Sequence, residues 1–370
     1  MKLLDTSLLC EKLTERQNAL IKSGKLGGCE ILIKQNGKAV FHKAFINELN
    51  SMYRLASMSK PVTTVAVLIE AERGHLSLDD KVSKYLSGFS NMYVGMLDEN
   101  GKAVPKEPVK NEITVEQLLN HTNGLFSDSD GVGVYQSSLF TKADRQNLAS
   151  YAYKIERSLL SFQPGEYAYY SGGAAHSVAA RLVEIVSGLP FEEYIQENIA
   201  KPLGIKDMTF VPSEEQWARM VLVHKYDDGK ARYIDIGKTM FEGIPLTFYS
   251  GAASLGGTAE AYSAFAEMLL NDGGNILKPE SVSLMKKAYV PISWNPADSQ
   301  WWGLGVRVIN NNEYILPKNS FGWSGAYGTH FWIDPENKIT AVYLRNSHYD
   351  GGAGAQIANW FEEDVMGSLK

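Results

Sequence analysis

Two Ser-x-x-Lys sequences in this chain could pair a nucleophilic serine with a base. One runs from Ser57 to Lys60 and the other from Ser283 to Lys286. Residues three apart share one face of a helix, so each lysine amine would lie beside its serine hydroxyl. A partly desolvated lysine can lose its charge and accept the serine proton, which activates the serine. A chain of this length holds about one or two such matches by chance, so the spacing alone identifies no site.

The surroundings of the two serines differ. Ser57 stands just before a helix predicted over residues 59–73, whose apolar stretch indicates burial. Ser283 lies within a polar segment that predicts a surface helix, with no nearby turn to present its side chain. Backbone N–H groups left unpaired at the start of a helix would also favour negative charge at Ser57. Context therefore favours Ser57 over Ser283, although an N-capping serine explains Ser57 equally well on context alone.

A resemblance to a known family separates these interpretations. The chain resembles the nucleophile region of class C serine β-lactamases at RLASMSKPVTTVAVLIEAERGHLSLDDKVSKYL, residues 54–86. Low-molecular-weight penicillin-binding proteins and the β-lactamase-like carboxylesterases (family VIII esterases) share this region. Further blocks resemble the family in the same order, at residues 113–125, 164–195, 251–274 and 321–344. Together they cover most of the chain from residue 27 onward, and they imply that Ser57 is the acyl-accepting nucleophile.

The resemblance also implies catalytic roles for residues outside the first block. Tyr170 follows a Pro-Gly pair, as the family's catalytic tyrosine does, and would move protons together with Lys60. It would help to activate Ser57 and then protonate the leaving group. The backbone N–H groups of Ser57 and Ala326 would form the oxyanion hole, in which each donor typically lowers the barrier by about 3–4 kcal/mol.

Two positions depart from the β-lactamase pattern. Gly172 replaces the Asn that holds the substrate's acylamino group, and Trp323 replaces the Lys that attracts its carboxylate. Losing a cation and an amide weakens recognition of anionic, amide-bearing substrates. Trp323 would form an apolar wall instead, which resembles the carboxylesterase branch. We expect Gly172, Trp323, Ser324 and Gly325 to bind substrate, the last of them by allowing close approach of the backbone.

The predicted function is that of a serine hydrolase that forms an acyl-enzyme, as a carboxylesterase on small acyl esters. The alternative within this class is a β-lactamase, a D-amino-acid peptidase or an acyltransferase with the same catalytic residues. A non-catalytic, penicillin-binding-like binding module is the alternative from another class, because a fold does not determine function. The presence of Ser57, Lys60 and Tyr170 argues against this module. The expected partner is a small-molecule ester or amide.

Other polar and aromatic residues near these motifs have simpler interpretations. Tyr169 is expected to pack as an aromatic ring, Glu166 to be a solvated loop charge and His121 to hold a turn by hydrogen bonds. Trp301 and Trp302 could line a cleft or pack in the core. The histidines lack metal-ligand spacing such as HExxH, and no nucleotide-binding glycine motif occurs between a strand and a helix. We therefore expect no metal and no cofactor.

The elements that must position these residues indicate an α+β fold. The resemblance implies the β-lactamase/transpeptidase-like fold, an antiparallel sheet flanked by helices, with a helical insertion domain. Strands are predicted at 29–33 and 39–45 around the hairpin turn Asn36-Gly37, and at 304–309, 314–316, 329–333 and 338–344. Further helices are predicted at 115–121, 143–160, 174–186, 191–200, 259–270 and 355–366.

The predicted domains follow from this order of elements. Residues 1–74 and 248–370 would form an α/β domain with a sheet completed by both termini. Residues 75–247 would form a mostly helical, loop-rich domain, in which the polar stretch 88–113 runs over the surface.

The composition is that of an ordinary globular chain of 370 residues, 44% of them hydrophobic and 21% charged. A formal net charge of −6 provides no basic field for nucleic acid or anionic lipid, so neither partner is expected. Cys10 and Cys29 are too few for a disulfide framework, and reduced thiols are expected, with one bridge between them left open. No apolar run approaches a signal peptide or the roughly 20 residues that span a bilayer, so the chain is expected to be cytoplasmic, without membrane contact. No feature indicates an oligomeric state.

Overall fold

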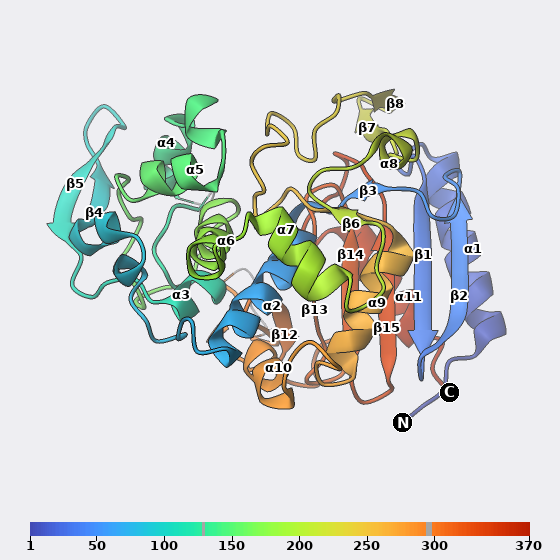
Figure 1. Ribbon diagram of the computed structural model, residues 1–370. Helices are drawn as coiled ribbons and strands as arrows, with labels where there is room; N and C mark the ends of the chain where they lie inside the picture. Colours follow the sequence, from blue (N-terminus) through green and yellow to red (C-terminus); the bar gives the residue numbers. More distant parts are fainter. Residues whose placement is uncertain (128–129, 294–297) are drawn as a thin grey trace.

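The computed structural model describes residues 1–127, 130–293 and 298–370. A β-sheet with helices on both faces forms one part of the molecule, and a mostly helical part adjoins it (Figure 1). Within the described residues the sheet has eight antiparallel strands, in the order β10 (Val290–Pro291), β11 (Gln300–Trp302), β12 (Arg307–Ile309), β13 (Phe321–Ser324), β14 (His330–Asp334), β15 (Ile339–Leu344), β1 (Cys29–Gln35) and β2 (Lys38–Phe45). The expected α+β fold with an antiparallel sheet is confirmed.

The N-terminal hairpin joins the sheet beside a strand from the other end of the chain. Ile31 of β1 pairs with Tyr343 of β15. Successive side chains of β1 point to opposite faces, so Ile31 and Ile33 enter one apolar cluster and Leu32 enters the other. Nearly every residue of β1 is therefore buried, as in a strand covered on both faces.

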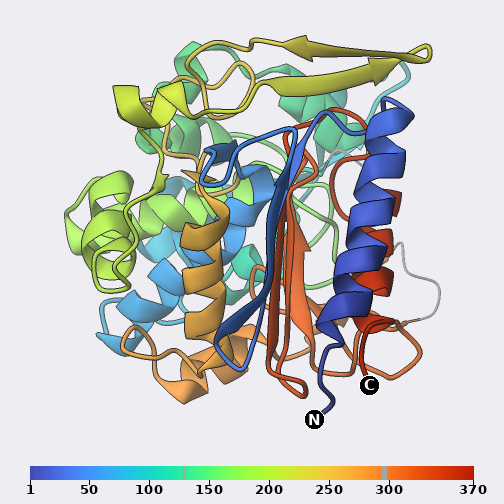
Figure 2. The same ribbon diagram turned by 90° about the vertical axis from the view of Figure 1, so that its right-hand side faces the viewer.

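Helices from both ends of the chain cover one face of the sheet. Figure 2 shows α1 (Thr6–Lys22) in blue and α11 (Gln356–Met366) in red along this face. The side chain of Asp5 caps α1 by accepting hydrogen bonds from the backbone N–H groups of the first turn. Apolar residues at helical spacing, such as Leu9, Leu13 and Phe361, pack there against the sheet.

The opposite face of the sheet packs against α9 (Ala259–Leu270) and α2 (Ser59–Glu72). As its apolar stretch predicts, α2 is buried nearly all round. It packs against α6 (Ala174–Ser187), which ends at Gly188 in the left-handed conformation (φ 73°). This central pair of helices links the sheet to the helical part of the molecule.

The remaining elements surround this centre. They are β3 (Tyr53–Arg54), β9 (Gly256–Gly257) and β6 (Met208–Thr209) in a small sheet, the hairpins β4 (Tyr93–Leu97)–β5 (Ala103–Pro108) and β7 (Val223–Asp227)–β8 (Lys230–Ile234), and α3 (Val115–Leu119), α4 (Gly131–Ser138), α5 (Leu148–Ile155), α7 (Phe191–Ile195), α8 (Glu214–Ala218) and α10 (Pro279–Met285).

Several predicted elements differ from the structure. The stretch 88–113, which was predicted to run over the surface, contains the hairpin β4–β5, which was not predicted. The helix predicted at 143–160 is a 3-10 turn followed by α5, because Asn147 caps a new helix start. The strand predicted at 304–309 shortens to β12 because Gly305 has a φ of 67°. Residues 314–316 form no strand, whereas β13 and β7–β8 form without having been predicted.

The state of the two cysteines and the character of the helices were also predicted from the sequence. Cys10 and Cys29 are free thiols, the first exposed and the second buried. In the described part of the chain, no helix has both the length and the apolar character needed to cross a bilayer.

Candidate active site

Ser57 lies at a sharp turn between a short strand and a buried helix. β3 pairs with β9, and the chain then passes through Leu55 and Ala56 into a 3-10 turn that leads directly to α2. Ala56 has a φ of 47°, a left-handed conformation that is costly for a residue with a Cβ. The turn is held on both sides of Leu55, whose N–H donates to Leu255 and whose carbonyl accepts from the Thr329 hydroxyl.

The Ser57 hydroxyl lies within hydrogen-bond distance of two groups that can move protons. Lys60 Nζ is 3.1 Å and the Tyr170 hydroxyl 2.8 Å from Ser57 Oγ. The lysine side chain is fully buried, and its Nζ also donates to the carbonyls of Gly172 at 2.7 Å and Ala252 at 2.9 Å. The i, i+3 spacing on the turn and first residues of α2 thus brings Ser57 and Lys60 together, and α6 begins just after Tyr170.

Aromatic side chains hold Tyr170 in place. Its ring stacks on Trp302 with an interplanar angle of 7° and lies 4.9 Å from the imidazole of His121. The indole N–H of Trp323 donates to the Tyr170 hydroxyl at 3.4 Å. His121 Nδ1 accepts from the backbone N–H of Ser171, so the chain on the C-terminal side of the tyrosine is held as well.

Two buried histidines lie behind this group. His121 and His176 are 5.2 Å apart, measured between ring centroids. Burial, and then the nearby charge of Lys60, hold the pKa of His121 well below its ordinary value. Burial does the same to the pKa of His176, with His121 and Lys60 adding to it. Both rings are therefore neutral at neutral pH.

Two cavities meet at Ser57. The first, of about 290 Å³, is the aromatic cavity, and its wall includes Phe126, Tyr151, Phe241, Ile244 and Phe248. The second, of about 280 Å³, is the tryptophan cavity, and it is lined by Ser57, Tyr170, Trp323, Ser324, Ala326, Gly352 and Ala353. Ser57, Tyr170 and Ala326 border both cavities, so a group bonded to the serine oxygen could extend into either one.

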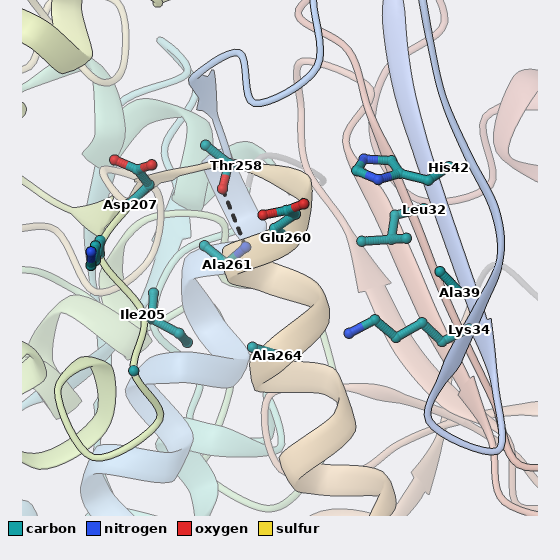
Figure 3. A pocket seen from close by; sticks show the side chains of 12 residues that line it. Leu32, Lys34, Ala39, His42, Ile205, Asp207, Thr258, Glu260, Ala261 and Ala264 are labelled. Atoms are coloured by element: carbon teal, nitrogen blue, oxygen red, sulfur yellow. Dashed lines mark hydrogen bonds between the residues drawn. The ribbon is translucent and has the colours of Figure 1, made fainter.

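A third hollow, of about 440 Å³, lies away from Ser57, between α9 and the β1–β2 hairpin (Figure 3). Thr258 caps α9 there by accepting from the N–H of Ala261. Two of the charged groups on its wall have partners, His42 with Glu30 at 2.9 Å and Asp207 with Arg219 at 2.7 Å, and the others are the side chains of Lys34, Lys206 and Glu260. This hollow therefore offers no reactive group comparable with Ser57.

The structure brings the residues predicted for the site together and leaves the competing ones outside it. Gly172 contributes its backbone carbonyl to Lys60, and Gly325 lies so close to Leu55 that a Cβ would come within 2.3 Å of the Leu55 carbonyl oxygen. The residues that lie elsewhere are Ser283, exposed on α10, Glu166, exposed in a loop, Tyr169, which packs edge-on against Phe162, and Trp301, whose indole N–H donates to the Asp298 carbonyl.

The sequence reasoning missed the walls of the site. The aromatic cavity draws Phe126, Tyr151 and Phe248 from separate segments, and no local pattern relates them. It also missed a buried contact behind the tryptophan cavity, where His330 lies between Ser324 and Glu362. Ser324 and His330 face each other on β13 and β14, a pairing that a correct prediction of β13 would have indicated.

Comparison with known proteins agrees with this geometry. A model of the family described as Beta-lactamase matches residues 12–362. Protein Rv1367c of Mycobacterium tuberculosis (strain ATCC 25618 / H37Rv) is 28% identical over 318 residues, which cover 80% of this chain and 77% of that protein.

Solved structures share the fold. EstCE1, described as a hydrolase with promiscuous acyltransferase activity, superposes with a TM-score of 0.82 and 22% identity, covering 98% of this chain and 99% of its own. A LovD6 mutant of simvastatin synthase (LovD) from Aspergillus terreus superposes with a TM-score of 0.80 and 22% identity, covering 97% of this chain and 95% of its own. Because the family model spans nearly the whole chain, the protein belongs to the beta-lactamase family, whose members are serine hydrolases.

Proposed function

We propose that this protein is a carboxylesterase that cleaves small acyl esters through an acyl-enzyme formed on Ser57. One observation carries the proposal: a single serine oxygen lies 3.1 Å from a buried lysine amine and 2.8 Å from a tyrosine hydroxyl, where two cavities meet. A nucleophile within reach of its base, beside space for a substrate, is the arrangement that acyl transfer requires.

The proposed reaction has two steps. In the first, Ser57 Oγ attacks the ester carbonyl while its proton passes to the Tyr170–Lys60 pair, and the backbone N–H groups of Ser57 and Ala326 hold the oxyanion. The tetrahedral intermediate collapses, the C–O bond to the alcohol breaks, and Tyr170 returns the proton to the departing alkoxide. In the second step, water gives a proton to the same pair and attacks the carbonyl of the acyl-enzyme. The bond between that carbon and Ser57 Oγ then breaks, and the pair returns the proton to Ser57 Oγ as the carboxylic acid leaves.

The composition of the cavities supports an ester rather than a β-lactam or a cell-wall peptide as substrate. The aromatic cavity suits an apolar acyl chain, because Phe126, Phe241, Ile244 and Phe248 lie on its wall. Arg145 and Glu242, of opposite charge, lie on the same wall. Trp323 stands where the β-lactamase pattern has a cation, and its indole N–H already donates to Tyr170. Gly172 offers no side-chain amide, and its carbonyl is bound to Lys60.

The proposal can be tested with a fluorophosphonate probe and p-nitrophenyl butyrate. Wild-type protein should gain one adduct by intact-mass spectrometry and hydrolyse the ester, and Ser57→Ala should do neither. Ser283→Ala is the matched control, because Ser283 occupies the other Ser-x-x-Lys sequence and is exposed on α10. Ester hydrolysis that survives in Ser57→Ala would refute the proposal.

The same preparation distinguishes the alternatives. Nitrocefin turnover that rivals ester turnover would indicate a β-lactamase, and release of D-alanine from a D-alanyl-D-alanine peptide would indicate a peptidase. An acyl product formed on an added alcohol in preference to water would indicate an acyltransferase. An acyl-enzyme that forms on Ser57 from p-nitrophenyl butyrate and never hydrolyses would indicate a binding module.

A further inference from the structure

A buried chain of hydrogen bonds leads from the tryptophan cavity into the core. Ser324 Oγ lies 2.8 Å from His330 Nδ1, and His330 Nε2 lies 3.0 Å from Glu362 Oε1. Arg307 pairs with the same carboxylate, and the Tyr314 hydroxyl donates to Glu362 Oε2 at 2.8 Å. Glu362 and His330 are almost completely buried, while Ser324 lies on the wall of the cavity.

The charge on Glu362 determines which nitrogen of His330 carries the proton. Burial alone would raise the pKa of Glu362, but the charge of Arg307 and the hydrogen bond from His330 lower it to about 2. An ionised carboxylate can only accept hydrogen bonds, so the His330 nitrogen that faces it, Nε2, must be the N–H.

The protonation of His330 determines the direction of its hydrogen bond with Ser324. Burial lowers the pKa of His330, although Glu362 opposes the change, so the ring is neutral at neutral pH. A neutral imidazole with its proton on Nε2 has a bare Nδ1, which can only accept. The Ser324 hydroxyl must therefore donate its single proton to His330, and only its lone pairs are left for a ligand in the tryptophan cavity.

We propose that Ser324 acts in the tryptophan cavity only as a hydrogen-bond acceptor, so that the substrate group bound there carries an O–H or N–H donor and no negative charge. This inference rests on the proposed esterase function and narrows its substrates to esters with such a group, as in an ester of a diol or an amino alcohol. His330 and Glu362 are positioning residues, since they act through Ser324.

A carboxylate would be a poor ligand for the same cavity. Its oxygens need donors, whereas the Ser324 proton is held by His330 and the Trp323 indole proton by Tyr170. Among the described residues that line the cavity, none is a lysine or an arginine. A carboxylate beside Ser324 and Trp323 would thus lose water without gaining a cation or a donor from either residue in exchange.

Matched esters test the inference through kcat/KM. Wild-type protein should prefer 2-hydroxyethyl butyrate over 2-methoxyethyl butyrate by about tenfold, the ratio that one hydrogen bond of typical strength supports. Carboxymethyl butyrate should be the poorest of the three. Methyl 3-hydroxybutyrate and methyl 3-methoxybutyrate form the equivalent pair with the donor on the acyl side, which covers the case in which that side enters the cavity.

Substitutions at Ser324 complete the design. Ser324→Ala should bring the hydroxy-to-methoxy ratio close to one, and Ser324→Thr, which keeps a hydroxyl, should preserve the preference. A ratio near one for both pairs in wild type, or a ratio unchanged in Ser324→Ala, would overturn the inference while leaving the esterase proposal standing. If wild-type protein cleaves no ester, p-nitrophenyl butyrate included, the function itself fails.

A spectroscopic measurement tests the proton direction without any substrate. Long-range ¹H–¹⁵N correlation spectra of histidine-labelled protein should show His330 with an unprotonated Nδ1 and a protonated Nε2. The Nδ1 resonance should move further toward the free-nitrogen value in Ser324→Ala, because it loses its hydrogen-bond donor. A protonated Nδ1 in wild type would overturn the inference, since the Ser324 hydroxyl could then donate to a carboxylate.

Discussion

The indole N–H of Trp323 donates to the hydroxyl oxygen of Tyr170 at 3.4 Å, and the same oxygen lies 2.8 Å from Ser57 Oγ. Trp323 therefore does more than replace the positively charged lysine of the β-lactamase pattern. Its indole N–H is a neutral donor to the Tyr170 oxygen, which is proposed to accept the serine proton. Such a donor stabilises negative charge on this oxygen when Tyr170 is deprotonated.

Trp323→Phe should lower kcat for p-nitrophenyl butyrate by about three- to tenfold, the effect of one lost neutral hydrogen bond. KM should change little, because a phenyl ring keeps most of the apolar wall. Trp301→Phe is the matched control, since that indole N–H donates to the Asp298 carbonyl outside both cavities. Equal kcat values in the two variants would show that the contact with Tyr170 has no role in turnover.

Lys60→Met should lower kcat by about 10³-fold, within the range that a positioned acid–base group contributes. The variant should also lose stability, by about 1–3 kcal/mol, because the half-buried carbonyl of Gly172 and the buried carbonyl of Ala252 lose their shared donor. Steady-state kinetics and urea unfolding measure the two effects separately. Tyr170→Phe removes only a hydroxyl and should reduce kcat with a smaller loss of stability; full activity in either variant would contradict the proposed roles.

Phe248→Leu should shift the preference toward longer acyl chains. Phe248 is buried on the wall of the aromatic cavity, and a smaller side chain there lengthens the space available to an acyl group. The ratio of kcat/KM for p-nitrophenyl octanoate to that for the butyrate should rise. Phe265→Leu on α9 is the control for general loss of packing, because Phe265 is equally buried but lines neither cavity. A rise of the same size in both variants would mean that the acyl chain does not occupy this cavity.

The free energy of unfolding should fall as the pH drops below 6.5. The pKa values of His121 and His176 lie well below 6.5 in the folded protein, so the unfolded chain binds these protons first. Each histidine should then lower the free energy of unfolding by up to about 1.4 kcal/mol per pH unit, at pH values between its pKa in the unfolded chain and its pKa in the folded protein. Above pH 6.5 the effect is absent. Urea titrations at pH 8.0, 6.5 and 5.0 measure it.

His176→Leu provides a sharper version of this experiment. Neither ring nitrogen of His176 has a hydrogen-bond partner among the described residues, so leucine removes the titration without breaking a bond. The loss of stability between pH 6.5 and pH 5.0 should shrink by the contribution of one histidine. A pH dependence equal to that of wild type would mean that His176 does not titrate in this way.

The reactive centre was predictable from sequence to the extent that it is local. Ser57 and Lys60 lie three residues apart, and helical geometry makes them neighbours once the helix is predicted. Tyr170 and Trp323 come from distant segments, and only their family resemblance linked them to the serine. The contact of His330 with Glu362 depends on how α11 lies on the sheet, which no short-range pattern encodes.

The elements of the fold were likewise predictable where their sequence signals are local. The Asn36-Gly37 turn predicts the β1–β2 hairpin, and Gly188 marks the end of α6. β7–β8 turns at Asp228-Gly229, an equally good signal, but β8 is largely exposed and both strands are mostly polar, so no apolar alternation revealed them. Short strands such as β13 gain their stability from neighbours on both sides rather than from their own sequence. The proposed division at residues 74/75 and 247/248 stays a prediction.

The pairing of β1 with β15 has a consequence for synthesis of the chain. Gln35, at the end of β1, makes a hydrogen bond to the Asn337 carbonyl, a residue 302 positions later. The N-terminal hairpin therefore leaves the ribosome long before the strand that must cover its edge has been made. Until translation reaches residues 339–344, that edge offers unpaired backbone groups to any other nascent chain nearby. The sheet is thus complete only when β15 has left the ribosome and paired with β1.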